Sequence, residues 1–151
     1  MKRSAFLRRQ ALAPGQKAMA PGKPMRQSRS TGTPTRAQSA RLETVKRLGC
    51  ICCMLNREIS KPTAYFGPCD AHHLLSGGRR RGHDFTIGLC KWHHQAEPPY
   101  SSMGMVQAIE LFGPTVASGS KPFHGLYGTD DELLEFQDAL LALHQSTGYA
   151  P

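Results

Sequence analysis

Cysteine and histidine residues gather in three short stretches of this sequence, and their number constrains the fold more than any other feature. Residues 69–73 read Cys-Asp-Ala-His-His and residues 90–94 read Cys-Lys-Trp-His-His, so two adjacent histidine pairs each begin three positions after a cysteine. A further stretch, Cys-Ile-Cys-Cys, occupies residues 50–53. A structural zinc ion uses four ligands, fewer than these stretches offer. We therefore expect one metal ion that stabilises the fold and a second that takes part in chemistry.

The spacing of four of these residues predicts the structural site. Two residues separate Cys50 from Cys53, and two separate Cys90 from His93. This spacing allows two side chains of one turn to bind the same zinc ion. The alternative is that these cysteines are only small buried groups. Because five cysteines cannot all form disulfides with one another, and because they lie near histidines, we expect metal ligation in a reducing cytoplasm.

Three histidines, His72, His73 and His94, remain for chemistry. A hydrolytic metal ion needs open positions for water and phosphate oxygens, and two imidazole ligands leave such positions. Neighbouring side chains of a strand point to opposite faces, so one histidine of the pair at 72–73 can bind the metal while the other takes a proton from water. A rival assignment, with Cys69 as a ligand beside His72, stays open. Asp70 could orient one of the histidines.

The basic residues are concentrated in the N-terminal third. Residues 1–48 hold 12 lysines and arginines and one acid, whereas residues 49–151 hold 7 basic and 10 acidic residues, so the first third accounts for the net charge of +8. Its prolines, glycines and serines predict a disordered tail. We expect the tail, which includes Lys2, Arg3, Arg8 and Arg9, to bind nucleic-acid phosphates. A merely solvated tail and an organelle transit peptide are the alternatives.

Hydrophobic periodicity and turn residues predict one domain of mixed helices and strands, with a core of roughly 100 residues. The expected elements are a helix through Leu42, Val45 and Leu48, strands over 63–66, 71–75 and 84–89, a flexible basic loop over 76–82, and helices from Cys90, over 105–112 and after the capping-box sequence at 129–132. The predicted fold class is therefore α+β, a small zinc-stabilised finger with flanking helices. The predicted boundaries are 1–40 for the tail, 41–146 for the domain and 147–151 for a C-terminal tail.

The predicted basic loop carries Arg79, Arg80 and Arg81 between the two groups of histidines. We expect these arginines to bind phosphates beside the second metal, a contact that positions nucleic acid without selecting a sequence. A solvated charged surface is the alternative. No run of 18 apolar residues occurs in the sequence, so we expect no membrane span.

The order of these residues over 72–94 resembles the motif of HNH, or ββα-metal, endonucleases, in the variant that opens with a histidine pair. The resemblance implies that His73 is the general base and that His72 and His94 bind a catalytic Mg²⁺ or Mn²⁺ ion. It also implies a zinc knuckle around the finger. The family usually has asparagine in the middle of the motif, where this chain has His83-Asp84-Phe85. We take His83 as a second catalytic candidate.

A narrower resemblance covers about residues 49–137. Together with the basic tail, the stretches 69–79, 82–84, 121–123 and 127–134 are similar to the phage Ref-type recombination enhancement nucleases. That family cuts DNA coated with RecA, and its basic N-terminus contributes to binding of DNA or of the filament. The resemblance implies a RecA filament as partner and the bacterial host cytoplasm as location. Spacing and composition alone do not point to RecA.

The residues and the resemblance together predict a metal-dependent endonuclease that hydrolyses phosphodiester bonds in DNA, with zinc as a structural cofactor. RecA dependence, and a role in phage recombination or repair, follow from the resemblance alone. The competing hypothesis is a zinc-stabilised DNA-binding module without catalysis. The two differ in whether the histidines beyond the zinc site carry chemistry.

Overall fold

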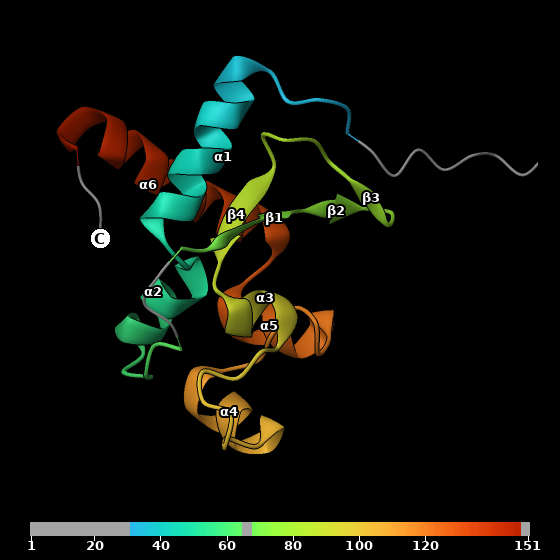
Figure 1. Cartoon of the computed structure of the whole chain (residues 1–151), viewed down its shortest axis with the longest axis vertical. Coiled ribbons are helices and arrows are strands. Elements are labelled where there is room, and N and C mark those ends of the chain that lie inside the picture. The colour runs from blue at the N-terminus through green and yellow to red at the C-terminus, as the bar shows by residue number, and fades with distance from the viewer. Residues whose placement is uncertain (1–30, 65–67, 149–151) are drawn as a thin grey trace, which may run out of the picture.

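Short helices surround a pair of antiparallel strands in this protein (Figure 1). The structure, a computed structural model, describes residues 31–64 and 68–148. The elements in chain order are α1 (Arg36–Leu48), α2 (Ile51–Glu58), β1 (Asp70–His73), β2 (Leu75–Ser76), β3 (Arg79–Arg80), β4 (Thr86–Leu89), α3 (Lys91–Gln95), α4 (Met105–Phe112), α5 (Ser120–Tyr127) and α6 (Asp130–Thr147). Among the described residues, no helix is both long enough and apolar enough to cross a bilayer.

The strand pair β1 and β4 lies at the centre, and α3 follows β4 after one residue. The strands are antiparallel, with Asp70 opposite Leu89 and His73 opposite Thr86. All four residues of β4 are buried, because α1, α2 and α6 contact this strand. Figure 1 shows α1 and α6 crossing beside β4, with α4 at the opposite end of the long axis. The buried core includes Trp92 and Phe123, which are each 1% exposed.

Capping boxes define where the two longest helices begin. Thr35 accepts a hydrogen bond from the backbone N–H of Gln38, and the Gln38 side chain accepts one from the backbone N–H of Thr35. Thr129 and Glu132 make the same reciprocal pair at the start of α6. These contacts satisfy N–H groups that have no partner within the helix. The start of α6 is where the sequence predicted it.

The helix α1 begins earlier than the sequence analysis expected. Residues 36–40 are helical, although the disordered tail was predicted to extend to residue 40. The Thr35 capping box stabilises this extra turn, and the Gln38 side chain also donates a 2.7 Å hydrogen bond to Asp84. Residues 1–30, which contain Lys2, Arg3, Arg8 and Arg9, lie outside the described residues, as do residues 149–151.

The predicted strands are shorter than expected. The strand predicted over 71–75 is interrupted at Leu74, which separates β1 from β2. The strand predicted over 84–89 begins only at Thr86. Residues 63 and 64 belong to no strand, and residues 65–67 lie outside the described part of the chain.

The segment 76–82 contains ordered secondary structure rather than only a loop. Its strand β3 pairs with β2, and Gly77 and Gly78 form the connecting turn with φ of 56° and 76°. Two positive φ angles in a two-residue turn match the right-handed twist of a hairpin, and glycine adopts them without steric cost. In Figure 1 this hairpin projects away from the helices.

Two helices, α2 and α5, were not predicted from the sequence. The Cys50–Cys53 stretch, which we interpreted as a tight turn, instead forms the start of α2, with Cys50 as its N-cap. The helix α5 contains Pro122 and Gly125, two residues that usually argue against a helix. Pro122 is tolerated because it lies in the first turn, where its missing N–H needs no partner within the helix.

Gly88 offers a test of how closely α1 approaches β4. A Cβ atom at Gly88 would lie 2.9 Å from the carbonyl oxygen of Val45 and still nearer to that of Gly49. We expect Gly88→Ala to lower the free energy of unfolding by roughly 1–3 kcal/mol, since backbone must move to relieve the clash. Urea denaturation measures this change.

The matched control is Gly125→Ala. Gly125 lies inside α5, and a Cβ atom there meets nothing within 4 Å. It should leave stability unchanged or raise it by up to about 1 kcal/mol, because alanine favours a helix over glycine. Equal effects of the two substitutions would contradict the close approach at Gly88.

Candidate functional site

The four residues predicted to bind zinc lie together in the core. The ligand atoms of Cys50, Cys53, Cys90 and His93 are all within 4.8 Å of one another, and all four residues are buried. The His93 Nδ1 atom lies 3.4, 3.6 and 3.2 Å from the sulfur atoms of Cys50, Cys53 and Cys90. Tetrahedral zinc with bonds of about 2.3 Å to sulfur places such ligands about 3.8 Å apart, close to the 3.9 Å between the Cys53 and Cys90 sulfurs. The set could therefore hold a metal such as zinc.

The two halves of this group have the same local geometry. Cys50 is the N-cap of α2 and Cys53 is the third residue of that helix. Cys90 is likewise the N-cap of α3, with His93 as its third residue. The N-cap and third positions of a helix face the same side of its first turn. This is why a spacing of two intervening residues brings each pair of ligand atoms together.

The protonation of the three thiols favours a cation among them. Hydrogen bonds from Cys50 and Cys90 hold the pKa of Cys53 far below its usual range. Burial raises the pKa of Cys50, and hydrogen bonding with Cys50 and Cys53 raises the pKa of Cys90. Burial thus works against ionisation of the three thiols together. A divalent cation would allow all three to ionise, because it supplies the charge that the buried sulfurs otherwise lack.

His93 is oriented for this role by groups on the other side of its ring. The Nε2 atom lies 3.0 Å from the carbonyl oxygen of Phe112 and 3.0 Å from the hydroxyl of Tyr127. The carbonyl can only accept, so Nε2 carries the hydrogen and Nδ1 presents its lone pair to the sulfurs. Asn56 supports this arrangement, since its side chain donates to the Phe112 carbonyl and accepts from Tyr127. Hydrogen bonds of this kind fix a metal-binding histidine in one tautomer.

His72 and His94, the predicted ligands of a second metal, lie side by side. Their ring centroids are 5.0 Å apart. Asp70 Oδ2 lies 3.1 Å from His94 Nδ1 and also accepts a 2.9 Å hydrogen bond from Lys91. The bond from Lys91 lowers the pKa of the Asp70 carboxyl, and His94 adds to the effect. Burial lowers the pKa of His72 to about 4, so its ring is neutral at pH 7, as metal binding requires.

His73 contacts a different histidine from the one that its neighbour His72 contacts. Its Nε2 atom lies 3.1 Å from Nδ1 of His83. The other nitrogen of His83 lies 3.1 Å from the carbonyl oxygen of Gly32 and 3.1 Å from the hydroxyl of Thr31. Since the carbonyl only accepts, His83 Nε2 carries a hydrogen, and a neutral His83 then accepts from His73 at Nδ1. This leaves the lone pair of His73 on its own Nδ1. Burial lowers the pKa of His73, and Arg80 adds to this effect.

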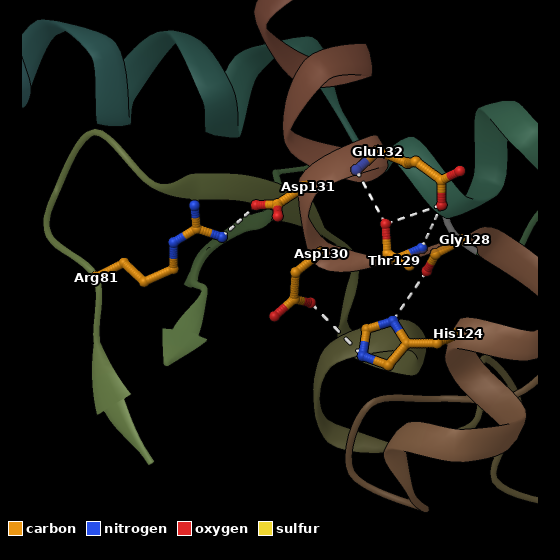
Figure 2. Close-up of polar contacts among 7 residues, drawn as sticks. All are labelled: Arg81, His124, Gly128, Thr129, Asp130, Asp131 and Glu132. Carbon is orange, nitrogen blue, oxygen red and sulfur yellow. Dashed lines mark hydrogen bonds and ion pairs between the residues drawn. The ribbon is translucent and has the colours of Figure 1, made fainter. Parts of the chain in front are cut away.

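The three arginines predicted to bind phosphates differ in their surroundings. Arg79 and Arg80 form β3, and both are exposed. Arg81 forms a salt bridge with Asp131 at the start of α6, and its guanidinium lies 4.5 Å from the ring centroid of Phe85. Figure 2 shows Arg81 reaching across to Asp131. Arg81 therefore connects the end of the hairpin to α6, while the side chains of β3 face solvent.

The remaining candidates have other surroundings. Cys69 is buried at 4% exposure, and burial raises the pKa of its thiol to about 12. It is not part of the Cys3His group. Cys52 is fully buried in the core, where it packs among apolar side chains.

Sequence reasoning missed two groups near the histidines. Thr31 and Gly32 hold His83, and His124 and Asp130 line a cavity together with His72. The Thr35-x-x-Gln38 sequence was a signal that order begins before residue 40. Nothing in the sequence brings His124 near His72, because the two residues are 52 positions apart.

Substitution of the cysteines tests which of them bind zinc. We expect Cys53→Ala to lose bound zinc and to unfold at a lower denaturant concentration, because structural zinc contributes directly to folding. Cys52→Ala is the matched control, since Cys52 is equally buried but lies outside the Cys3His group. It should retain one equivalent of zinc. Elemental analysis of the purified proteins measures metal content, and retention of zinc by Cys53→Ala would refute the assignment.

Comparison with known proteins supports one of the two resemblances. Residues 34–142 match the model of a protein family described as recombination enhancement, RecA-dependent nuclease. The matched stretch runs from just before α1 into α6, well over half of the chain. No curated protein and no solved structure matched the chain. The narrower resemblance is thus confirmed, and the chain belongs to the RecA-dependent nucleases of recombination enhancement.

Proposed function

We propose that this protein is an HNH-type, metal-dependent DNA endonuclease that cuts RecA-coated DNA during phage recombination or repair, in the cytoplasm of the bacterial host. The observation that carries the proposal is the separation of the two neighbouring histidines of β1. His72 lies beside His94, and His73 lies beside His83. One pair is suited to bind a metal ion and the other to move a proton. The succession of β1, β4 and α3 supports the assignment, since two strands followed by a helix give the ββα-metal motif its name.

In this proposal His73 is the general base. Its Nδ1 lone pair takes a proton from the water that attacks phosphorus, while its Nε2–H donates to His83. His83 is then a positioning residue that holds the base in one tautomer. It replaces the asparagine that HNH motifs usually have at this place. The carbonyl of Gly32 fixes His83 in turn.

The chain offers ligands for two kinds of metal ion. Cys50, Cys53, Cys90 and His93 would hold structural zinc. His72 and His94 would hold Mg²⁺ or Mn²⁺, with Asp70 orienting His94 through Nδ1. When bound, this second ion supplies positive charge for the phosphorane oxygens and the leaving O3′.

DNA binding in this proposal depends on arginines and on the basic tail. The exposed Arg79 and Arg80 of β3 would contact phosphates near the histidines. Lys2, Arg3, Arg8 and Arg9 of the tail would add attraction that does not depend on DNA sequence. Family membership supports DNA and a RecA filament as partners, because the family is described as RecA-dependent.

Removal of the base tests the proposed mechanism. We expect His73→Ala to reduce the rate of DNA cleavage by about 10²- to 10⁴-fold, because general-base catalysis contributes about this factor. Nicking of DNA in the presence of RecA, ATP and Mg²⁺ measures the rate. Zinc content should stay unchanged, since His73 is not part of the Cys3His group.

His144→Ala is the control for the loss of a histidine elsewhere, since His144 lies near the end of α6. It should cut at the rate of the unsubstituted protein. Loss of zinc from His73→Ala would show that the ligands are divided differently. An unsubstituted protein that binds zinc and DNA but never nicks would instead favour a DNA-binding module.

The hairpin arginines can be tested through the salt dependence of DNA binding. Each phosphate contact contributes a slope of roughly 0.9 to the dependence of log K on log salt for duplex DNA. We expect the double substitution Arg79→Gln and Arg80→Gln to lower the slope by roughly 1.8, as titrations at several salt concentrations would measure. Arg57→Gln, an exposed arginine of α2, is the matched control and should leave the slope unchanged. An unchanged slope in the double variant would show that the hairpin arginines do not contact DNA phosphates.

A further inference from the structure

A cavity of about 180 Å³ lies beside His72. His72 lines one part of it and His124 and Asp130 another, while Leu75, Ile87 and Phe123 supply apolar walls. The volume is many times the roughly 10–15 Å³ that one water molecule needs. A more open groove of about 590 Å³ shares Leu75, His124 and Asp130 with the cavity and continues to Arg81. A strand lying in the groove could therefore reach His72 and His124 together.

The ring of His124 is held in one orientation. Its Nδ1 atom lies 2.9 Å from the carbonyl oxygen of Gly128, and the backbone N–H of Gly128 donates to the carbonyl of His124. Gly128 has a φ of 95°, which favours glycine, and this turn directs its carbonyl back toward the ring. Because a carbonyl only accepts, His124 Nδ1 carries a hydrogen. Nε2 is then the nitrogen that remains for the cavity.

The Nε2 atom of His124 faces the carboxylate of Asp130 at 3.6 Å (Figure 2). A carboxylate accepts a proton and does not donate one, so the contact is attractive only when Nε2 also carries a hydrogen. Both side chains are 34% exposed, so solvent and a substrate can reach them. An imidazolium at this position would present its Nε2–H at the edge of the cavity.

Acidic residues in the groove do not leave it strongly negative. Figure 2 shows two pairs, His124 with Asp130 and Arg81 with Asp131. The Arg81 guanidinium offsets the charge of Asp131, and a protonated His124 would offset that of Asp130. A phosphate could take the place of either carboxylate as hydrogen-bond acceptor, because phosphate oxygens accept from the same donors.

We propose that His124 is the general acid of the reaction and that it protonates the leaving O3′ from Nε2. The inference rests on the proposed nuclease function and adds a residue that the histidine motif does not contain. Water attacks phosphorus, and its proton passes to His73. The bond from phosphorus to O3′ breaks, its electron pair goes to O3′, and O3′ takes the proton of His124 Nε2. The products are a 5′-phosphate and a 3′-hydroxyl, and both histidines return to their starting states by exchange with solvent.

Asp130 is a positioning residue in this scheme. Its carboxylate keeps the hydrogen of His124 Nε2 directed toward the cavity until substrate enters. The location of Asp130 at the first position of α6 fixes this carboxylate relative to His124, because the Thr129 capping box holds the start of the helix. His124 and His72 lie on different elements, α5 and β1, and both line the cavity.

A substrate whose leaving group needs no proton can show whether His124 acts as a general acid or has only a structural role. The full chain is first used with a RecA-coated oligonucleotide, ATP and Mn²⁺ to map one linkage that the unsubstituted protein cuts. The same oligonucleotide is then made with sulfur in place of O3′ at that linkage. A thiolate leaves without protonation because a thiol is far more acidic than an alcohol, and Mn²⁺ tolerates sulfur as a ligand.

The informative variant is His124→Asn, whose side-chain amide can still donate to the carbonyl of Gly128 in place of Nδ1. It should cut the ordinary linkage about 10²- to 10⁴-fold more slowly, the contribution of general acid catalysis. It should cut the sulfur linkage with a far smaller loss. His144→Ala, at the far end of α6, is the matched control and should cut both linkages at the rates of the unsubstituted protein.

Equal losses on both linkages, in a variant that retains its zinc and its unfolding temperature, would overturn the inference, since a structural role affects both alike. Unchanged cutting of the ordinary linkage would overturn it as well. Should His124→Asn fail to fold, His124→Gln measured on the same two linkages decides in the same way. Failure of the proposed function is distinct, because the unsubstituted protein would then cut neither linkage.

Discussion

The Cys3His group is the contact on which the rest of the structure depends. It joins the first turn of α2 to the first turn of α3, and through His93 it reaches the carbonyl of Phe112 at the end of α4 and the hydroxyl of Tyr127 at the end of α5. Four helices thus meet at one buried cluster in a domain too small for a large apolar core. The cluster also sets the direction of α3. Because His93 points inward to the sulfurs and successive helical residues are rotated by about 100°, His94 faces a different side, where it meets His72.

Two consecutive residues of β1 also serve two different sites. Adjacent side chains of a strand alternate between faces, so the pair His72 and His73 supplies two environments from two consecutive residues. His72 lies beside His94, the residue that follows His93 of the Cys3His group, and His73 lies beside His83, which is held by the segment before α1. A metal bound at the Cys3His group would therefore stabilise the fold and also position the histidines proposed for catalysis. Loss of the cluster would disturb the proposed site even if no catalytic side chain were changed.

Local patterns predicted much of this arrangement, and long-range contacts account for the rest. The Cys3His group, the helix over 105–112 and the start of α6 follow from spacings of a few residues, which local geometry determines. The strands were predicted too long because the break at Leu74 depends on how the β2–β3 hairpin leaves the strand pair. The role of Arg81 could not be inferred, since its partner Asp131 is 50 positions away. The position of His124 beside the same cavity as His72 could not be inferred for the same reason. The early start of α1 is different, because the Thr35 capping box was visible in the sequence.

The uneven distribution of charge along the chain offers a physical reason why a nuclease of this family would depend on a partner already bound to DNA. Residues 49–151 hold fewer basic than acidic residues, and Arg81, one of the few arginines near the histidines, is paired with Asp131. This part of the chain has little long-range attraction for DNA of its own. Strong binding must then come from the basic N-terminal third or from a protein already assembled on the DNA. A filament that concentrates the nuclease on its strand raises the effective concentration of substrate without new contacts at the cleavage site. Weak affinity of residues 49–151 for DNA would make cutting conditional, because this part of the chain alone would seldom engage DNA long enough to cut it.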